Sequence, residues 1–164
     1  MEECGPFVSK FALSDYLCIQ IDVLGRIVAI DYGTKRTGIA VTDEGQIIAS
    51  PLETVPTHEL MLFLEAYFAK EKVETMVVGR PKKLDNTASE SMKAIQFFVQ
   101  AFRKRFTRIP VEWMDERFTS KLAMDAMVSG GMKKSDRRKK GNIDKVSAAI
   151  ILQSFLELKN NRGG

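Results

Sequence analysis

The stretch that decides the fold is RIVAIDYG, residues 26–33. A short run of apolar, largely β-branched residues that ends in a carboxylate and a glycine is typical of a buried strand. Two further runs follow at 37–42 and 46–54, and Asp43-Glu44-Gly45 between them predicts a tight turn. Because short loops join all three runs, we expect an antiparallel meander.

Helical and extended patterns alternate along the rest of the chain. Thr57 is expected to cap a helix that reaches about Lys72, and Thr87 with Glu90 forms a capping box for a helix that reaches about Phe106. Strands are predicted at 74–79 and 110–115, and helices at 120–129 and 142–159. Strands that alternate with helices need crossover connections and pair in parallel, so we expect an α/β fold with a mixed five-stranded sheet flanked by helices. The buried face of the first helix is expected to comprise Leu60, Phe63, Leu64, Tyr67 and Phe68.

Length and composition indicate one soluble domain. The 164 residues are 45% apolar and 28% charged, which is ordinary for a globular protein. No stretch approaches eighteen consecutive apolar residues, so we expect no membrane span and no membrane partner. The two cysteines, Cys4 and Cys18, form neither a zinc site nor a disulfide framework, which favours a reducing, cytoplasmic location.

The first 25 residues differ from the rest of the chain. They hold four acids and one base, a net charge of −3; since the whole chain carries +4, the remainder carries +7. They do not resemble a signal peptide. We expect an atypical N-terminal extension over 1–25, either disordered or the product of a misassigned start, then one domain over 26–159 and a flexible tail over 160–164. A basic body suits a polyanionic partner, although charge alone is weak evidence.

Acidic residues end two predicted strands and stand on the last helix. Asp31 ends the first strand, Asp115 and Glu116 end the fifth, and Asp144 shares a helix face with apolar residues four, seven and eleven positions further on. Because sites in open α/β sheets gather at the carboxyl ends of strands, these acids are candidates for one catalytic, metal-binding group. Clustered carboxylates repel one another unless a hard cation compensates, which favours Mg²⁺ or Mn²⁺ and a two-metal hydrolysis of phosphodiesters. With His58 as the single histidine, a histidine-based mechanism is poorly supported.

Each acid also has a purely structural interpretation. Asp31 would take part in a turn, the pair at 115–116 would form an ion pair with Arg117, and Asp144 would be an acid favoured at a helix N-terminus. No acid is persuasive alone, and their combination is what favours function. Trp113, inside the fifth strand, is expected to pack in the core.

Basic residues surround the predicted site. Gly33 and Gly38 bracket a loop in which the backbone can approach a partner closely. The run 133–140 holds six bases and one acid, and it is interpreted either as a solvated linker or as a phosphate clamp. The nucleic-acid-binding candidates are Lys35, Arg36, Arg80, Lys82, Lys83, Arg117, Lys133, Lys134, Arg137, Arg138, Lys139 and Lys140.

Four motifs taken together resemble a known family. They are Asp31-Tyr32-Gly33 with Arg36 and Gly38-Ile39-Ala40, then Gly79-x-Pro81, then Asp115-Glu116-Arg117-Phe118-Thr119-Ser120, and finally Asp144-x-x-Ser147-Ala148-x-Ile150-Ile151-Leu152. The set resembles the YqgF/RuvX family over about residues 25–158, a family described as pre-16S rRNA nucleases or Holliday-junction-resolvase-like proteins. Asn86 and Ser147 stand where that family usually has Gly and Ala, which are mild departures.

The resemblance implies an RNase-H-like fold, a cytoplasmic location and processing of the 5′ end of the small-subunit rRNA precursor. It implies that Asp31, Asp115/Glu116 and Asp144 bind the catalytic metal, with Arg117 beside them. The partners would be pre-rRNA or branched DNA and the small ribosomal subunit, with the protein a monomer or a homodimer. Three alternatives stay open: a Holliday junction resolvase, a non-catalytic RNA-binding assembly factor, and a nucleotide-binding module whose Asp31–Thr34 hairpin resembles the phosphate loop of actin-like ATPases.

Overall fold

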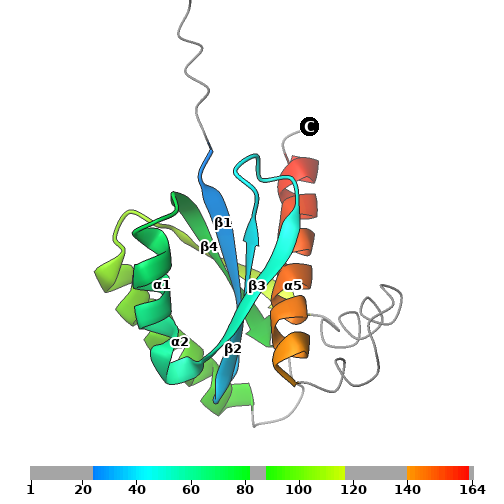
Figure 1. Cartoon of the computed structure of the whole chain (residues 1–164). Helices are drawn as coiled ribbons and strands as arrows, with labels where there is room; N and C mark the ends of the chain where they lie inside the picture. Colours follow the sequence, from blue (N-terminus) through cyan, green and yellow to red (C-terminus); the bar gives the residue numbers. More distant parts are fainter. Residues whose placement is uncertain (1–23, 82–87, 117–139, 163–164) are drawn as a thin grey trace, which may run out of the picture.

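A computed structural model of the chain describes residues 24–81, 88–116 and 140–162. These residues form three layers, with a sheet between helices on both of its faces (Figure 1). Helices α1 (Leu60–Phe68) and α2 (Ala88–Arg105) cover one face, and the long helix α5 (Lys140–Arg162) covers the other. The predicted α/β class and its flanking helices are confirmed.

The sheet has five strands in the order β3-β2-β1-β4-β5. Strands β1 (Arg26–Tyr32), β2 (Arg36–Thr42) and β3 (Ala49–Pro56) form the predicted antiparallel meander. Strands β4 (Val73–Pro81) and β5 (Val111–Glu116) join it in parallel to β1. The carboxyl ends of β1, β4 and β5 therefore meet at one edge of the sheet.

Alternation along the strands divides the core between the two faces of the sheet. Val28 and Ile30 face α1 and α2, whereas Ile27 and Ala29 pack against α5. A strand directs successive side chains to opposite faces, so the run that opens β1 supplies both halves of the core. The next position on the α5 side is Asp31, and this places a carboxylate on the face that α5 covers.

The β2–β3 connection is longer than predicted, because β3 begins at Ala49 and not at Gln46. The carboxylate of Asp43 accepts hydrogen bonds from the backbone N–H groups of Gly45, Ile47 and Ile48, at 3.1, 2.8 and 2.7 Å. Gln46 has a φ of 55°, which does not fit a strand. The hydrogen bonds to the Asp43 carboxylate thus hold residues 45–48 in a loop, where the sequence predicted the start of a strand.

The first helical segment also differs from its prediction. Residues Thr57–Glu59 form a short 3₁₀ turn, η2, without a side-chain cap, and α1 ends at Phe68 rather than near Lys72. Of its predicted buried face, Leu60 and Leu64 are fully buried and the three aromatic residues are partly buried. The backbone carbonyl of Lys72 instead accepts a 2.8 Å bond from the N–H of Arg26.

The last helix is longer than predicted at both ends. It spans Lys140–Arg162, so it includes the final base of the predicted linker and three residues of the predicted tail region. Residues 1–23, the capping-box position Thr87, the predicted helix 120–129 and most of the basic run lie outside the described residues. No helix of the described ranges is long and apolar enough to span a membrane.

Candidate active site

Asp31 stands at the end of β1, opposite a glycine of β2. The Cα register pairs Asp31 with Gly38 and Tyr32 with Thr37. Asp31 is partly exposed, whereas the preceding residues Ala29 and Ile30 are fully buried. Asp31 thus lies at the edge of the sheet, directly after the buried residues of β1, as the sequence predicted.

Gly38 lets the start of α5 lie directly on β2. A Cβ atom built at Gly38 would overlap the backbone carbonyl of Asp144 and the N–H of Lys145. Since every other residue has a Cβ, only glycine permits this approach. The partner of Asp31 in the β1–β2 ladder therefore contacts the backbone of Asp144, a residue 113 positions after Asp31 in the sequence.

The side chain of Asp144 lies beside a cation. Its Oδ2 is 3.6 Å from Nε of Arg36, and the two side chains are 22% and 43% exposed. The apolar residues that share its helix face are buried (Ala148 and Ile151) or partly buried (Phe155) against the sheet. Asp144 is thus held at the end of the helix–sheet interface, which confirms its predicted helix face.

Thr57 holds the loop that follows Asp31. Its hydroxyl donates a 2.6 Å bond to the backbone carbonyl of Gly33, and Oγ1 of Thr37 lies 3.0 Å from Oγ1 of Thr57. Because the Thr57 proton is used on Gly33, Thr37 is the donor in the second bond. The N–H of Thr57 also donates to the carbonyl of Lys35 at 3.1 Å. Sequence patterns did not reveal this role, since a threonine before a helical run is expected to cap that helix.

The acidic pair at the end of β5 occupies two different faces of the sheet. Asp115 pairs in register with Arg80, and Glu116 pairs with Pro81. Met114 packs against α5, so alternation puts position 116 on the α5 face and position 115 on the α2 face. Only position 116 shares its face with Asp31 and Asp144. The side chain of Glu116 lies outside the described residues.

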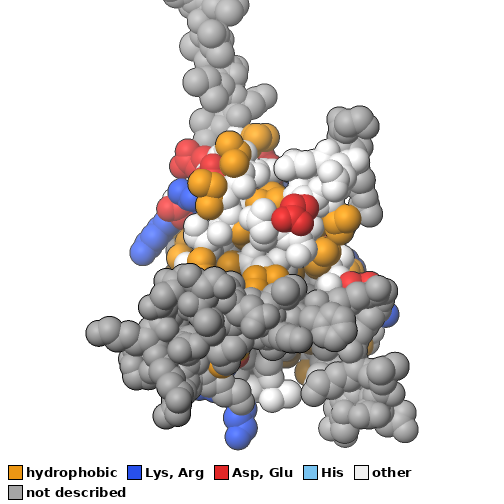
Figure 2. Space-filling view, turned by 90° about the vertical axis from the view of Figure 1, so that its right-hand side faces the viewer, with side chains coloured by type: hydrophobic (Ala, Val, Ile, Leu, Met, Phe, Trp, Pro, Cys, Tyr) orange, Lys and Arg blue, Asp and Glu red, His pale blue; other side chains and the backbone are white. Residues whose placement is uncertain are grey.

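The basic candidates are only partly described. Lys35, Arg36 and Arg80 are exposed at the same edge of the sheet as Asp31. Lys82, Lys83, Arg117 and the run from Lys133 to Lys139 lie outside the described residues, as does the side chain of Lys140. In the view of Figure 2, the described Lys and Arg side chains that can be seen lie toward the margins of the molecule.

Comparison with known proteins places these features in one family. Residues 25–158 match the family model described as "RuvX: Holliday junction resolvase". The chain belongs to the RuvX family. A protein of Bacteroides thetaiotaomicron named "Putative pre-16S rRNA nuclease" is 57% identical over 136 residues, which cover 83% of this chain and 99% of that protein. A protein of the same name from Christiangramia forsetii is 56% identical over 133 residues, covering 81% and 98%.

The fold of this RuvX-family chain resembles that of a solved resolvase. T. thermophilus RuvC in complex with a Holliday junction substrate superposes with a TM-score of 0.52 at 20% sequence identity, covering 82% of this chain and 96% of that one. At this identity the likeness concerns the fold alone. It supports the predicted RNase-H-like class.

The oxygen donors at this edge suit a hard divalent cation. Asp31 and Asp144 supply carboxylate oxygens, the ligands that Mg²⁺ and Mn²⁺ prefer. Within the described ranges no group of three or more His, Cys, Asp or Glu residues is arranged to hold a metal ion. Position 116, whose side chain is not described, lies on the same face of the sheet as Asp31.

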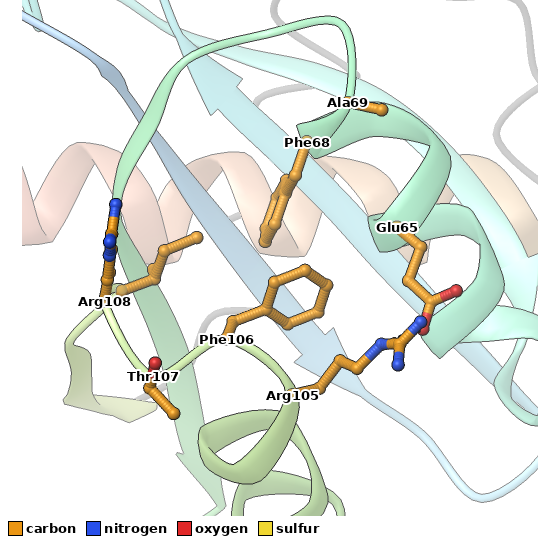
Figure 3. Close-up of a pocket in the computed structure, with 8 residues that line it drawn as sticks. Glu65, Phe68, Ala69, Arg105, Phe106, Thr107 and Arg108 are labelled. Atoms are coloured by element: carbon orange, nitrogen blue, oxygen red, sulfur yellow. Dashed lines mark ion pairs between the residues drawn. The ribbon is translucent and has the colours of Figure 1, made fainter.

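A larger pocket lies at the opposite end of the parallel strands. It has a volume of about 500 Å³ and is formed by the C-terminal ends of α1 and α2 and the segment before β5 (Figure 3). Phe68, Phe106 and Ile109 supply apolar walls, and Arg105 forms a 2.8 Å ion pair with Glu65 at the rim. Because it adjoins the amino ends of β4 and β5, it is separate from the carboxylates.

Proposed function

We propose that this RuvX-family chain is a divalent-metal-dependent endonuclease that processes the 5′ end of pre-16S rRNA. The observation that supports the proposal best is the contact of Gly38 with the backbone of Asp144, directly across the ladder from Asp31. This close contact between Gly38 and α5 leaves no room for a side chain at position 38. It would serve to hold Asp144 near Asp31, if the two carboxylates act together. The names of the relatives at 57% and 56% identity favour pre-16S rRNA as the substrate.

We assign the metal ligands to Asp31, Asp144 and Glu116. Position 116 shares the α5 face with the other two, whereas Asp115 belongs to the α2 face beside Arg80. This assignment narrows the acidic pair of the sequence motif to its second member. Bound Mg²⁺ or Mn²⁺ would supply an activated water and stabilise the charge that develops on the phosphate.

The protein's own residues prepare that chemistry. Thr57 and Thr37 fix the loop at Gly33, which follows Asp31 by two residues, so the carboxylate is held in position before substrate arrives. Lys35 and Arg36 are exposed beside it and supply cations for the phosphate backbone. Arg36 also balances the charge of Asp144 until substrate binds. This activity on pre-rRNA would place the protein in the cytoplasm with the assembling small subunit.

Cleavage of a labelled pre-16S rRNA fragment in Mg²⁺ or Mn²⁺ tests the proposal. Asp31→Asn and Asp144→Asn should each lower the cleavage rate about a hundredfold or more, because each removes a charged ligand from the ion. Glu157→Gln, an exposed acid on the same helix as Asp144, is the matched control and should cleave like wild type. Equal cleavage by wild type and Asp31→Asn would reject the assignment.

The acidic pair provides a sharper comparison. Glu116→Gln should lose cleavage as Asp31→Asn does, whereas Asp115→Asn should retain most of it. If Asp115→Asn is the inactive variant, the assignment by sheet face is wrong.

Resolution of Holliday junctions is the second candidate function. The description of the matched family favours it. A four-way DNA junction and its component duplexes belong in the same assay as the rRNA fragment, with sedimentation to establish whether a dimer forms. If only the junction is cleaved, the same carboxylates act on branched DNA and not on pre-rRNA.

A further inference from the structure

A second pocket lies close to the proposed site, on the α2 side of the sheet. It has a volume of about 230 Å³ and is lined by Arg80, Met92, Gln96 and Trp113. Arg80 is the register partner of Asp115, and Trp113 lies two residues before Asp115 on β5. The pocket is therefore next to the carboxyl ends of β4 and β5, at the same edge of the sheet as Asp31.

Local structure explains why these four side chains converge. β5 is the last strand of the sheet, so Trp113 has no further strand to cover it and remains 38% exposed. The predicted core packing of Trp113 is wrong in this respect. Met92 and Gln96 are four residues apart on α2 and share one side of that helix, while Ile95 and Val99 anchor the helix in the core.

The lining combines a flat aromatic surface, a flexible apolar side chain, an amide and a guanidinium. The indole ring of Trp113 and the side chain of Met92 provide apolar surface against which a planar ring can pack. Gln96 offers both a donor and an acceptor to the edge of a base, and Arg80 offers donors to a phosphate or a base carbonyl. Among the described residues that line the pocket, one is a cation and none is a carboxylate, which favours an anionic ligand.

We propose that this pocket binds one unstacked nucleobase of a single-stranded segment of the nucleic-acid substrate. The inference rests on the proposed function only in taking a nucleic acid as the ligand. Base stacking on an aromatic side chain is sequence-tolerant and needs a base that is not already stacked in a helix. The pocket would therefore select unpaired nucleotides beside the scissile phosphate, as are found next to a processed RNA end.

The pocket on the other side of β5 fits this ligand less well. It has a volume of about 340 Å³ and also borders Trp113, but its lining includes the carboxylate of Glu112 and the ammonium of Lys159 together with Phe155 and Leu158 of α5. The charges of Glu112 and Lys159 offset each other, whereas Arg80 is the one charged residue in the described lining of the α2-side pocket, so charge favours a phosphate in the pocket with Arg80.

Trp113 is the single tryptophan of the chain, so intrinsic fluorescence reports on a ligand beside its indole ring, and the Gln96 variant below separates this pocket from the one on the α5 side. In EDTA, which prevents cleavage, an eight-nucleotide single-stranded RNA should quench the emission. A blunt RNA duplex and inorganic polyphosphate, which offers phosphates without bases, should bind with little quenching. Quenching of the same size by polyphosphate would overturn the proposal.

Substitutions test the same contact by anisotropy of the labelled single strand. Trp113→Leu should weaken its binding about tenfold, the scale of one lost base stack, and leave polyphosphate binding unchanged. Trp113→Phe should retain part of the affinity and serves as the variant closest in shape. Gln96→Ala should weaken binding a few-fold, whereas Phe97→Ala, a neighbouring residue that is 70% exposed and outside the pocket lining, should not.

Wild-type affinity in both Trp113 variants would contradict the proposal. Binding is measured in EDTA, where no cleavage occurs. The base-pocket proposal and the nuclease proposal, which the Asp31→Asn variant tests, can therefore be rejected independently. A protein that quenches with single strands but never cleaves would support the base pocket and reject the nuclease.

Discussion

The guanidinium Nε of Arg36 lies 3.6 Å from Oδ2 of Asp144, so a cation from the second strand stands beside a carboxylate from the last helix. Both side chains retain solvent contact, and an isolated pair of this kind adds little to stability, about 0–1 kcal/mol. Its consequence is electrostatic: Arg36 offsets negative charge at the sheet edge and remains accessible to a phosphate.

Arg36→Gln is accordingly expected to change binding more than stability. The affinity for RNA should fall, and the slope of log K against log salt should become shallower by about one, because one phosphate contact is lost. The free energy of unfolding should change by less than about 1 kcal/mol. Filter binding between 50 and 300 mM salt and urea denaturation measure the two quantities.

Arg105→Gln is the matched control for this prediction. Arg105 also pairs with a carboxylate, Glu65, but lies at the far end of the parallel strands. An equal change of salt slope in both variants would mean that Arg36 contributes only general positive charge.

Gly38→Ala should disturb the helix–sheet contact at the site. The new methyl would overlap the carbonyl of Asp144, so α5 must move away from β2, at a cost of about 1–3 kcal/mol. Cleavage should fall further than the loss of folded protein explains, because Asp144 moves with the helix. Thr34→Ala, at an exposed position of the neighbouring loop, should be near wild type in both measurements.

Local patterns predicted most of the fold. The apolar run of residues 26–30 that ends at Asp31 and the helical spacing after Asp144 each depend on neighbours within one element. Gly38 was predicted to permit a close backbone approach, and the structure identifies the approaching group as the carbonyl of Asp144.

Contacts between distant segments account for the failures. Thr57 bonds to Gly33, 24 residues away, and this bond replaces the helix cap that its local sequence favours. Trp113 is exposed because β5 is an edge strand, and strand order is not encoded in the pattern of β5 itself. The sequence leaves Asp115 and Glu116 equivalent, and the proposed preference for Glu116 rests on the packing of Met114 against α5, a contact between distant segments.

Thr57→Val tests the hydrogen bonds that hold the loop after Asp31. The substitution keeps the shape of the side chain but leaves the carbonyl of Gly33 and the hydroxyl of Thr37 without their present partner. We expect a loss of about 1–3 kcal/mol of unfolding free energy and slower cleavage with little change in RNA affinity. Thr107→Val, an exposed threonine at the opposite end, is the control. Unchanged cleavage would remove Thr57 from the positioning of Asp31.

Ser147→Ala should leave stability unchanged or increase it. The hydroxyl of Ser147 is buried on α5 and has no hydrogen-bond partner among the described residues. Burial of an unsatisfied hydroxyl costs about 1–3 kcal/mol, and alanine also has the higher helix propensity. Thermal unfolding of the two proteins measures the difference. A decrease in the melting temperature would show that the hydroxyl has a partner beyond the described residues.

Gln46 links three segments at the end of the sheet remote from the site. Its Nε2 donates to the carbonyl of Gly25 at 2.6 Å and to Oε2 of Glu74 at 2.8 Å, and its Oε1 accepts from Nζ of Lys159 at 2.6 Å. Gln46→Ala should lower the unfolding free energy by about 1–3 kcal/mol, since it leaves these groups unsatisfied. Gln153→Ala, an exposed glutamine on α5, should change it by less than about 0.5 kcal/mol.

The same network predicts a pH dependence. A backbone hydrogen bond from Gly25, and then the bond from Gln46, lower the pKa of Glu74 from its ordinary value of 4.5. A carboxylate whose pKa is depressed by folding stabilises the protein above its unfolded pKa, and that contribution is lost as the pH falls through the folded pKa. Wild type should therefore exceed Glu74→Gln in unfolding free energy at pH 6, and the difference should shrink as the pH is lowered below 4.5. A difference that stays constant across this range would mean that the charge of Glu74 contributes nothing, and that the network depends on the shape of the side chain alone.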